Sequence, residues 1–213
     1  MSARTLWLAL TALAMVPSLA GAHGDIKGLG SFYAGALHPF LVPAHLVALL
    51  GLGLLVGQRG LAFGRYPMLA LLLALLTGLV ASGSVAGFDL ERPVLGGAAL
   101  CALAVVAALP LPRWALFALA ALIGAGIGLG SAPEGRFESA RWSSLAGTGL
   151  GAFLAVIVVG ALVDRLRPSW ARVGIRIAGS WLAASALLVL ALSFVTTPPV
   201  RGSSPVAGAN AAR

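Results

Sequence analysis

The sequence predicts an all-α fold, a bundle of about six transmembrane helices that follows a cleaved signal peptide. Of the 213 residues, 60% are hydrophobic and only 9% are charged, whereas soluble domains carry about 25% charged residues. The mean hydropathy is +1.01. Apolar runs of about 20 residues, long enough to cross a bilayer, recur from one end of the chain to the other.

Residues 1–22 have the three parts of a secretory signal peptide. Arg4 supplies the basic first part, residues 6–16 the apolar core, and Ala-Gly-Ala at 20–22 a cleavage site of small residues. Cleavage there would make His23 the first residue of the mature protein. An uncleaved first helix is the alternative.

Residues 23–197 are predicted to form the six-helix transmembrane domain. A polar, glycine-rich tail opens it, and residues 198–213, rich in Pro, Gly and Ala, are expected to be a disordered tail. Glycines four residues apart are typical of helices that pack closely in lipid; they occur at 53 and 57, 83 and 87, 124 and 128, and 147 and 151. The predicted spans are residues 35–58, 67–87, 94–111, 114–131, 144–163 and 177–195.

The formal net charge of +8 comes from fourteen basic and six acidic residues. Alternating spans put the loops with Arg59 and Arg65, with Arg113, and with residues 165–176 on one side, and these loops hold a single acid, Asp164. Because Lys and Arg mark cytoplasmic loops, we predict a bacterial inner-membrane protein with a periplasmic mature N-terminus. The bilayer is the expected partner. Nucleic acid is not, because no basic residues form a stripe.

Several classes of enzyme are excluded. The one lysine, Lys27, lies in no phosphate-binding loop, and no histidine follows residue 45 to complete a serine-first triad. The single cysteine, Cys101, has no partner for redox chemistry. We therefore expect neither an enzyme nor a permanently bound cofactor.

The stretch most typical of function is residues 35–58, which begins with two histidines and two prolines. Pro43 suits the first position of a helix, where its missing amide would be unpaired anyway. From Pro43 to Gly57 such a helix is about 22 Å long, short of the roughly 30 Å hydrocarbon core. Residues 32–42 are therefore expected to complete the crossing as a separate segment of a broken span.

His38 and His45 are seven residues apart, which in a straight helix would separate them by about 10 Å. A break at Pro39 and Pro43 would bring them together. Imidazole suits nickel, cobalt, copper and zinc, and ionisable groups within a span indicate function, so both are candidate metal ligands. The alternative is that each histidine only hydrogen-bonds to a neighbouring helix.

A second candidate metal site lies at the predicted mature N-terminus. The α-amino group and the imidazole of His23 would chelate an ion together, with the carboxylate of Asp25 close by. The alternative is that cleavage happens to leave a histidine at this position.

The stretch GSFYAGALHPFLVPAHLVALLGLGLLVGQ, preceded by His-Gly after the signal peptide, resembles the HupE/UreJ family of hydrogenase- and urease-accessory membrane proteins. The family pattern is close to G-x-x-H-P-x-x-G-x-D-H. The family's histidine-rich stretch near the end of the fourth span has no counterpart, since residues 124–131 read GAGIGLGS. The pattern is matched by Gly35, His38, Pro39 and His45, while Val42 and Ala44 stand at its glycine and aspartate positions.

The resemblance implies a secondary permease for nickel or cobalt that supports metalloenzyme maturation. His38 and His45 would be ligands for the transported ion, and His23 and Asp25 would receive it first. Metalloenzyme maturation proteins are the further partners it implies. A non-transporting accessory protein that scaffolds or delivers metal is the rival hypothesis, and a metal-independent transporter of another small solute is a third.

Overall fold

The computed structural model describes residues 30–82, 89–131, 138–166 and 168–195. Within these ranges the chain is all-helical, which confirms the predicted fold class. The predicted signal peptide, His23, Asp25 and the C-terminal tail lie outside the described residues. The helices are α2 (Ser31–Leu41), α3 (Pro43–Arg59), α4 (Leu61–Ala81), α5 (Glu91–Ala107), α6 (Arg113–Gly130), α7 (Glu138–Arg165) and α8 (Ser169–Leu192).

Four of the described helices, α4, α6, α7 and α8, are long and apolar enough to cross a membrane, and the bent pair α2–α3 makes a fifth candidate. The remaining helix, α5, has 17 residues and is about 26 Å long, somewhat less than a hydrocarbon core. In order along the chain these elements coincide with the six predicted spans. The count of six stays a prediction.

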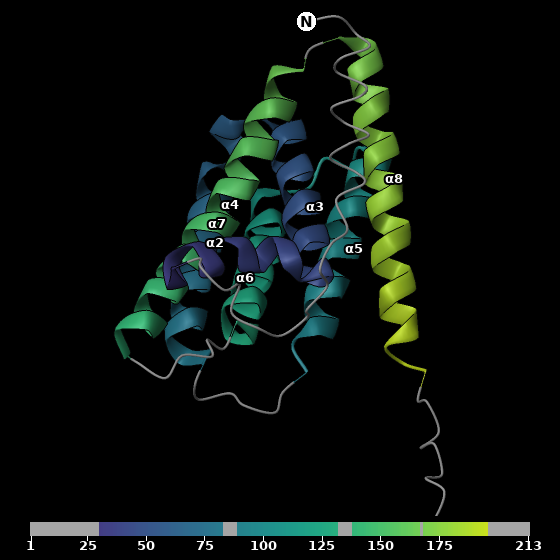
Figure 1. Ribbon diagram of the computed structural model, residues 1–213. Coiled ribbons are helices and arrows are strands. Elements are labelled where there is room, and N and C mark those ends of the chain that lie inside the picture. The colour runs from purple at the N-terminus through teal and green to yellow at the C-terminus, as the bar shows by residue number, and fades with distance from the viewer. Residues whose placement is uncertain (1–29, 83–88, 132–137, 167, 196–213) are drawn as a thin grey trace, which may run out of the picture.

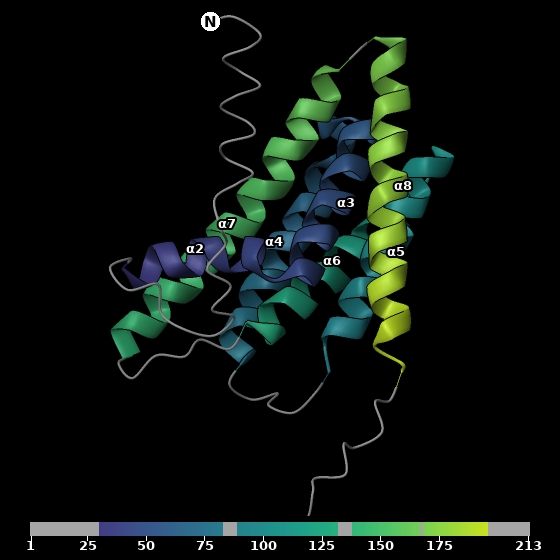
Figure 2. The same cartoon turned by 45° about the vertical axis from the view of Figure 1, so that its right-hand side comes forward.

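The longer helices run side by side, while α2 lies across them (Figures 1 and 2). The centre of the bundle is α3, which packs against every other described helix. Its buried residues run without a gap from Gly51 to Gly57, and a helix that is apolar all round belongs in a core. The largest fully buried side chains lie on α3 and on the helices around it, and include Leu49, Leu52, Leu55, Leu71, Leu75, Leu95 and Ile123.

Three helices begin six or more residues earlier than the predicted spans, because apolar runs mark only the part of a helix that faces lipid or core. Serine, arginine and glutamate are compatible with helix, so α7 and α8 extend into the polar segments that precede them, and α4 extends back through Arg65 to Leu61. The predicted loops are correspondingly shorter. Arg65 lies inside α4, Arg172 and Arg176 lie inside α8, and α3 is separated from α4 by Gly60 alone, at φ 87°.

The basic loops meet at one end of the bundle, as the alternating topology predicts. Arg59, at the end of α3, donates a hydrogen bond of 3.2 Å to the carbonyl of Leu111 in the α5–α6 connection. Arg176, in the second turn of α8, donates one of 2.7 Å to the carbonyl of Val106 near the end of α5. The connections after α3, α5 and α7 therefore share an end; the side of the membrane that it faces stays a prediction.

Glycine lets α4 and α6 approach each other closely. A Cβ added at Gly128 of α6 would lie 2.5 Å from the carbonyl oxygen of Leu75 and 2.9 Å from the Cα of Gly78, both in α4. Backbone cannot move away as the end of a side chain can. The predicted role of the glycine pairs in helix packing is confirmed at 53 and 57, 124 and 128, and 147 and 151; residues 83 and 87 lie outside the described residues.

Replacing Gly128 with alanine is expected to destabilise the protein by about 1–3 kcal/mol, the usual range for overpacking. Thermal unfolding of the purified protein in detergent measures this as a lower Tm. Gly174→Ala is the matched control, because nothing lies within 4 Å of its added Cβ; it should leave the Tm unchanged or raise it slightly. Equal Tm values for the two variants would contradict the close packing of α4 on α6.

Candidate functional site

The chain breaks between α2 and α3 at Val42, where the two helix axes bend by 76°. Val42 is extended, at φ −90° and ψ 111°, and Pro43 is the first residue of α3. A residue before proline is pushed out of helical conformation, and proline itself has no N–H to donate to the preceding turn. The predicted break is therefore confirmed at Pro43. At Pro39 the prediction is wrong, because Pro39 lies inside α2, which continues to Leu41.

The bend decides how much of the membrane crossing each helix makes. The eleven residues of α2 are about 16 Å long, but at 76° to α3 they add only about 4 Å along the α3 axis. This is less than the share of the crossing expected of residues 32–42. The reason is that α2 is held across α7.

Two glycines hold the backbone of α2 against that of α7. A Cβ at Gly147 of α7 would collide with the carbonyl oxygen of Phe32, and a Cβ at Gly35 of α2 would collide with the carbonyl of Ser144. Such contacts require residues without a side chain on both helices. They fix the direction of α2, and with it the position of His38.

Thr148 of α7 compensates for the amide that Pro39 lacks. In a helix the N–H of residue 39 would bond to the carbonyl of residue 35, but proline has none. Thr148 is only 3% exposed. Its hydroxyl donates toward the Gly35 carbonyl at 3.1 Å and is equally close to the Ser144 carbonyl of its own helix. An α7 side chain thus completes the hydrogen bonding of α2 one turn before His38.

The bend brings His38, in the last turn of α2, next to His45, in the first turn of α3. Their ring centres are 5.9 Å apart and the ring planes meet at 64°. With metal–nitrogen bonds of about 2.1 Å and roughly 1.1 Å from nitrogen to ring centre, two imidazoles on one ion have centres at most about 6.4 Å apart. The predicted convergence of the two histidines is confirmed, and the separation of their ring centres lies below this limit.

Both imidazoles are left with a buried nitrogen that lacks a partner. Within the described residues, neither Nε2 of His38 nor Nδ1 of His45 has a hydrogen-bond partner. His45 is only 6% exposed, and its Nε2 faces Gly130, the last residue of α6, where an added Cβ would lie 3.8 Å away. An unpaired buried polar group costs about 1–3 kcal/mol, which a bound ligand would offset. For these two atoms, the described residues do not provide the helix–helix hydrogen bonds of the alternative interpretation.

The pair stands without further metal ligands in the part of the chain that the structure describes, where no group of three or more His, Cys, Asp or Glu gathers. Ala44, at the position of the aspartate in the family pattern, is 1% exposed and packed in the core. The other predicted site residues, His23 and Asp25, lie outside the described residues. The arrangement offers two imidazole ligands and leaves the remaining coordination positions of an ion open.

The sequence does not single out Thr148, and it marks Gly147 only as one of the helix-packing glycines, although both residues position the histidines. Proline at 39 signals that the Gly35 carbonyl needs another donor, but which helix supplies it depends on tertiary packing. Buried polar groups are nearly always paired, so a threonine inside an apolar span is the one signal available.

Thr148→Val is expected to lower stability by about 1 kcal/mol, because it keeps the shape of the side chain but leaves the buried Gly35 carbonyl unpaired. Amide hydrogen exchange should accelerate in α2, with a modest drop in Tm. Thr77→Val is the control, since the exposed Thr77 hydroxyl bonds only to carbonyls of its own helix, α4. Equal exchange of α2 in the two variants would show that Thr148 does not hold it.

Comparison with known proteins adds one match. The family described as HupE / UreJ protein matches residues 11–191, most of the chain. No curated protein and no solved structure matches. The matched region contains the broken helix pair with its two histidines and nearly all of the apolar helices. The chain therefore belongs to the HupE/UreJ family of accessory and permease-like proteins, and it is a multi-pass membrane protein.

Proposed function

We propose that this protein is a secondary permease that passes a divalent transition metal, nickel or cobalt, across the membrane and so supplies metalloenzyme maturation. The observation that carries the proposal is the pair of imidazoles at the α2–α3 break, with ring centres 5.9 Å apart and two buried nitrogens unpartnered among the described residues. Imidazole is a suitable ligand for late first-row divalent metals.

A two-ligand site is consistent with transport rather than storage. Conduction requires binding that is favourable enough for entry and weak enough for release. Four-ligand sites that stabilise a fold are closed, whereas two imidazoles leave positions for water or for ligands further along the path. A broken helix also exposes backbone carbonyls near the ion, as discontinuous helices of transporters do.

The direction of transport follows from the proposed topology. The histidine pair lies near the end of α6 at Gly130, opposite to the end where Arg59 and Arg176 gather. If the arginine end is cytoplasmic, the pair faces the periplasm of a bacterial inner membrane. His23 and Asp25 on the mature N-terminus would then be the first residues to meet the incoming ion.

An accessory protein that delivers metal without transporting it is the second candidate. The observation in its favour is the buried Ala44 where the family pattern has aspartate, together with the lack of a third ligand in the described part of the chain. A carboxylate near the imidazoles would strengthen the hold on a divalent cation and help strip its water.

Metal accumulation in cells tests the proposal. Cells expressing wild type, His38→Ala, His45→Ala or Leu37→Ala are compared with empty-vector cells for nickel, cobalt and copper content. Leu37 is the control because its exposed side chain lies in the same helix as His38. The proposal expects a rise in nickel or cobalt that both histidine variants abolish and Leu37→Ala retains. No rise for any metal, with the protein present in the membrane, would favour the accessory role.

A further inference from the structure

Two arginines converge on one aromatic ring at the end of the bundle opposite to the histidines. The guanidinium carbon of Arg59 lies 4.9 Å from the centre of the Phe63 ring, and that of Arg113 lies 5.0 Å from it. The two cations are therefore within about 10 Å of each other, a separation at which salt screens their repulsion only partly.

The described residues give this positive charge no ion-pair partner. Neither arginine forms an ion pair there, although Asp164 is at the same end, beside Gly60. Arg59 donates to the Leu111 carbonyl, but its buried Nε has no hydrogen-bond partner in the described part of the chain. Arg113 is exposed. The cluster thus retains donors and charge for an anion.

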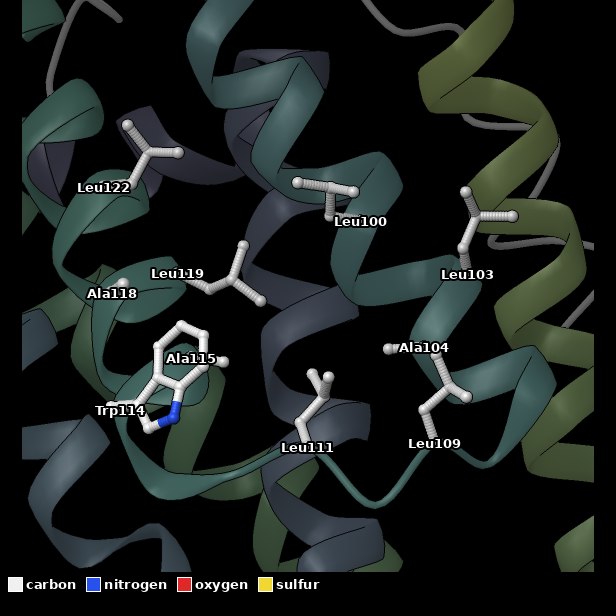
Figure 3. Close-up of a pocket in the computed structure, with 10 residues that line it drawn as sticks. All are labelled: Leu100, Leu103, Ala104, Leu109, Leu111, Trp114, Ala115, Ala118, Leu119 and Leu122. Atoms are coloured by element: carbon white, nitrogen blue, oxygen red, sulfur yellow. The ribbon is translucent and has the colours of Figure 1, made fainter.

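An apolar groove of about 420 Å³ lies beside the arginines, between α5 and α6. Figure 3 shows its walls, with Leu100 on α5 opposite Leu119 and Leu122 on α6, and with Leu111 in the connection between the two helices. The groove continues the arginine cluster directly, because Leu111 is the residue whose carbonyl Arg59 bonds. Its volume lies within the roughly 300–1,000 Å³ of ordinary ligand sites.

Trp114 lies between the arginine cluster and the apolar groove. Its side chain is 74% exposed, it follows Arg113 in sequence, and it lines the groove at the end nearest the α5–α6 connection (Figure 3). Tryptophan prefers the level of lipid headgroups, with its ring toward the acyl chains. From Trp114 to Leu122 the groove follows about 12 Å of α6, close to the depth of one leaflet of a core of roughly 30 Å.

We infer that this end of the protein binds an anionic phospholipid, with its phosphate at Arg59 and Arg113 and an acyl chain in the groove between α5 and α6. Charge complementarity selects the headgroup, since basic pockets between membrane helices bind anionic lipids. The apolar lining selects a ligand with a hydrocarbon chain over a free anion. This inference does not depend on metal transport.

Native mass spectrometry of the detergent-purified protein tests the inference, with phosphatidylglycerol and phosphatidylcholine added at equal concentration. Wild type should retain phosphatidylglycerol preferentially. Arg113→Gln, an exposed position that should fold normally, should reduce this retention about fivefold. Arg172→Gln removes the same charge from an exposed site on α8 and is the control that should bind as wild type does. Ala118→Trp, which fills the groove, should reduce retention of both lipids.

Three results would overturn the inference. Equal loss in Arg113→Gln and Arg172→Gln would mean that lipid responds only to the general surface charge. Displacement of phosphatidylglycerol by excess inorganic phosphate would mean that the groove holds no acyl chain. A lipid-free dimer that Ala118→Trp abolishes would mean that a second copy of this chain occupies the groove.

Discussion

Replacing His45 with alanine is expected to lower the affinity of the purified protein for nickel by at least about 100-fold, and replacing His38 as well is expected to add little. Losing a group that only orients a metal ligand already lowers metal affinity by about 10–100-fold. Removing a ligand itself should lower the affinity by at least as much. Because the ring centres are 5.9 Å apart, the two imidazoles would form one chelate. Once either is lost, the other holds the ion weakly.

Equilibrium dialysis of the detergent-purified wild type, the two single histidine variants and the double variant measures these affinities. It is run in a His23→Ala background, so that a site at the N-terminus does not mask the one at the helix break. Leu37→Ala is the control for changes in α2 that leave both imidazoles in place. Two binding sites in the wild type, one of which each single variant leaves at its wild-type affinity, would place the histidines in separate sites.

Gly147→Ala is expected to lower the affinity for nickel as well, by at least about tenfold, although Gly147 is not a candidate ligand. The added Cβ would collide with the Phe32 carbonyl, and backbone on both sides leaves no side chain that could move away. We expect α2 to lift from α7 and His38 to move away from His45. A displacement of 1 Å or more is enough to disrupt a site that requires fixed geometry.

Gly149→Ala separates this effect from a general loss of stability. It is two residues along the same helix, and its added Cβ would meet only the Leu79 and Leu76 side chains, at 3.4 and 3.6 Å. Nickel affinity should stay near the wild-type value in this variant and fall at least tenfold in Gly147→Ala. Similar affinities in the two, with both proteins folded, would mean that the α2–α7 contact does not position His38.

The sequence predicts the fold class well, because apolar runs reflect the solvent of each helix directly. It also predicts the break before α3, since Pro43 acts locally on itself and on Val42. It does not predict that α2 lies across the bundle, because that direction is set by the contact of Gly35 and Gly147 with backbone far away in the chain. The starts of α7 and α8 are missed for another reason: both helices begin in polar residues, which the apolar runs do not mark.

In the candidate site, too, the sequence predicts what local residues determine and misses what distant contacts determine. Proximity of His38 and His45 follows from the break that Pro43 imposes between them, so the sequence predicts it and the structure confirms it. Thr148 is 113 residues from the carbonyl that it bonds, and no local pattern connects them. The metal itself, and the roles of His23 and Asp25, remain predictions that depend on the family resemblance and on ligand chemistry.

Uptake by liposomes reconstituted with the purified full-length protein tests the central claim most directly. Nickel or cobalt is added outside, and a metal-sensitive dye reports its arrival inside, for wild type, His45→Ala and protein-free liposomes. The proposal predicts uptake by wild type that His45→Ala reduces to the protein-free rate. Uptake by wild type no faster than in protein-free liposomes, while the same preparation binds the metal through His45, would contradict a permease and identify an accessory protein instead.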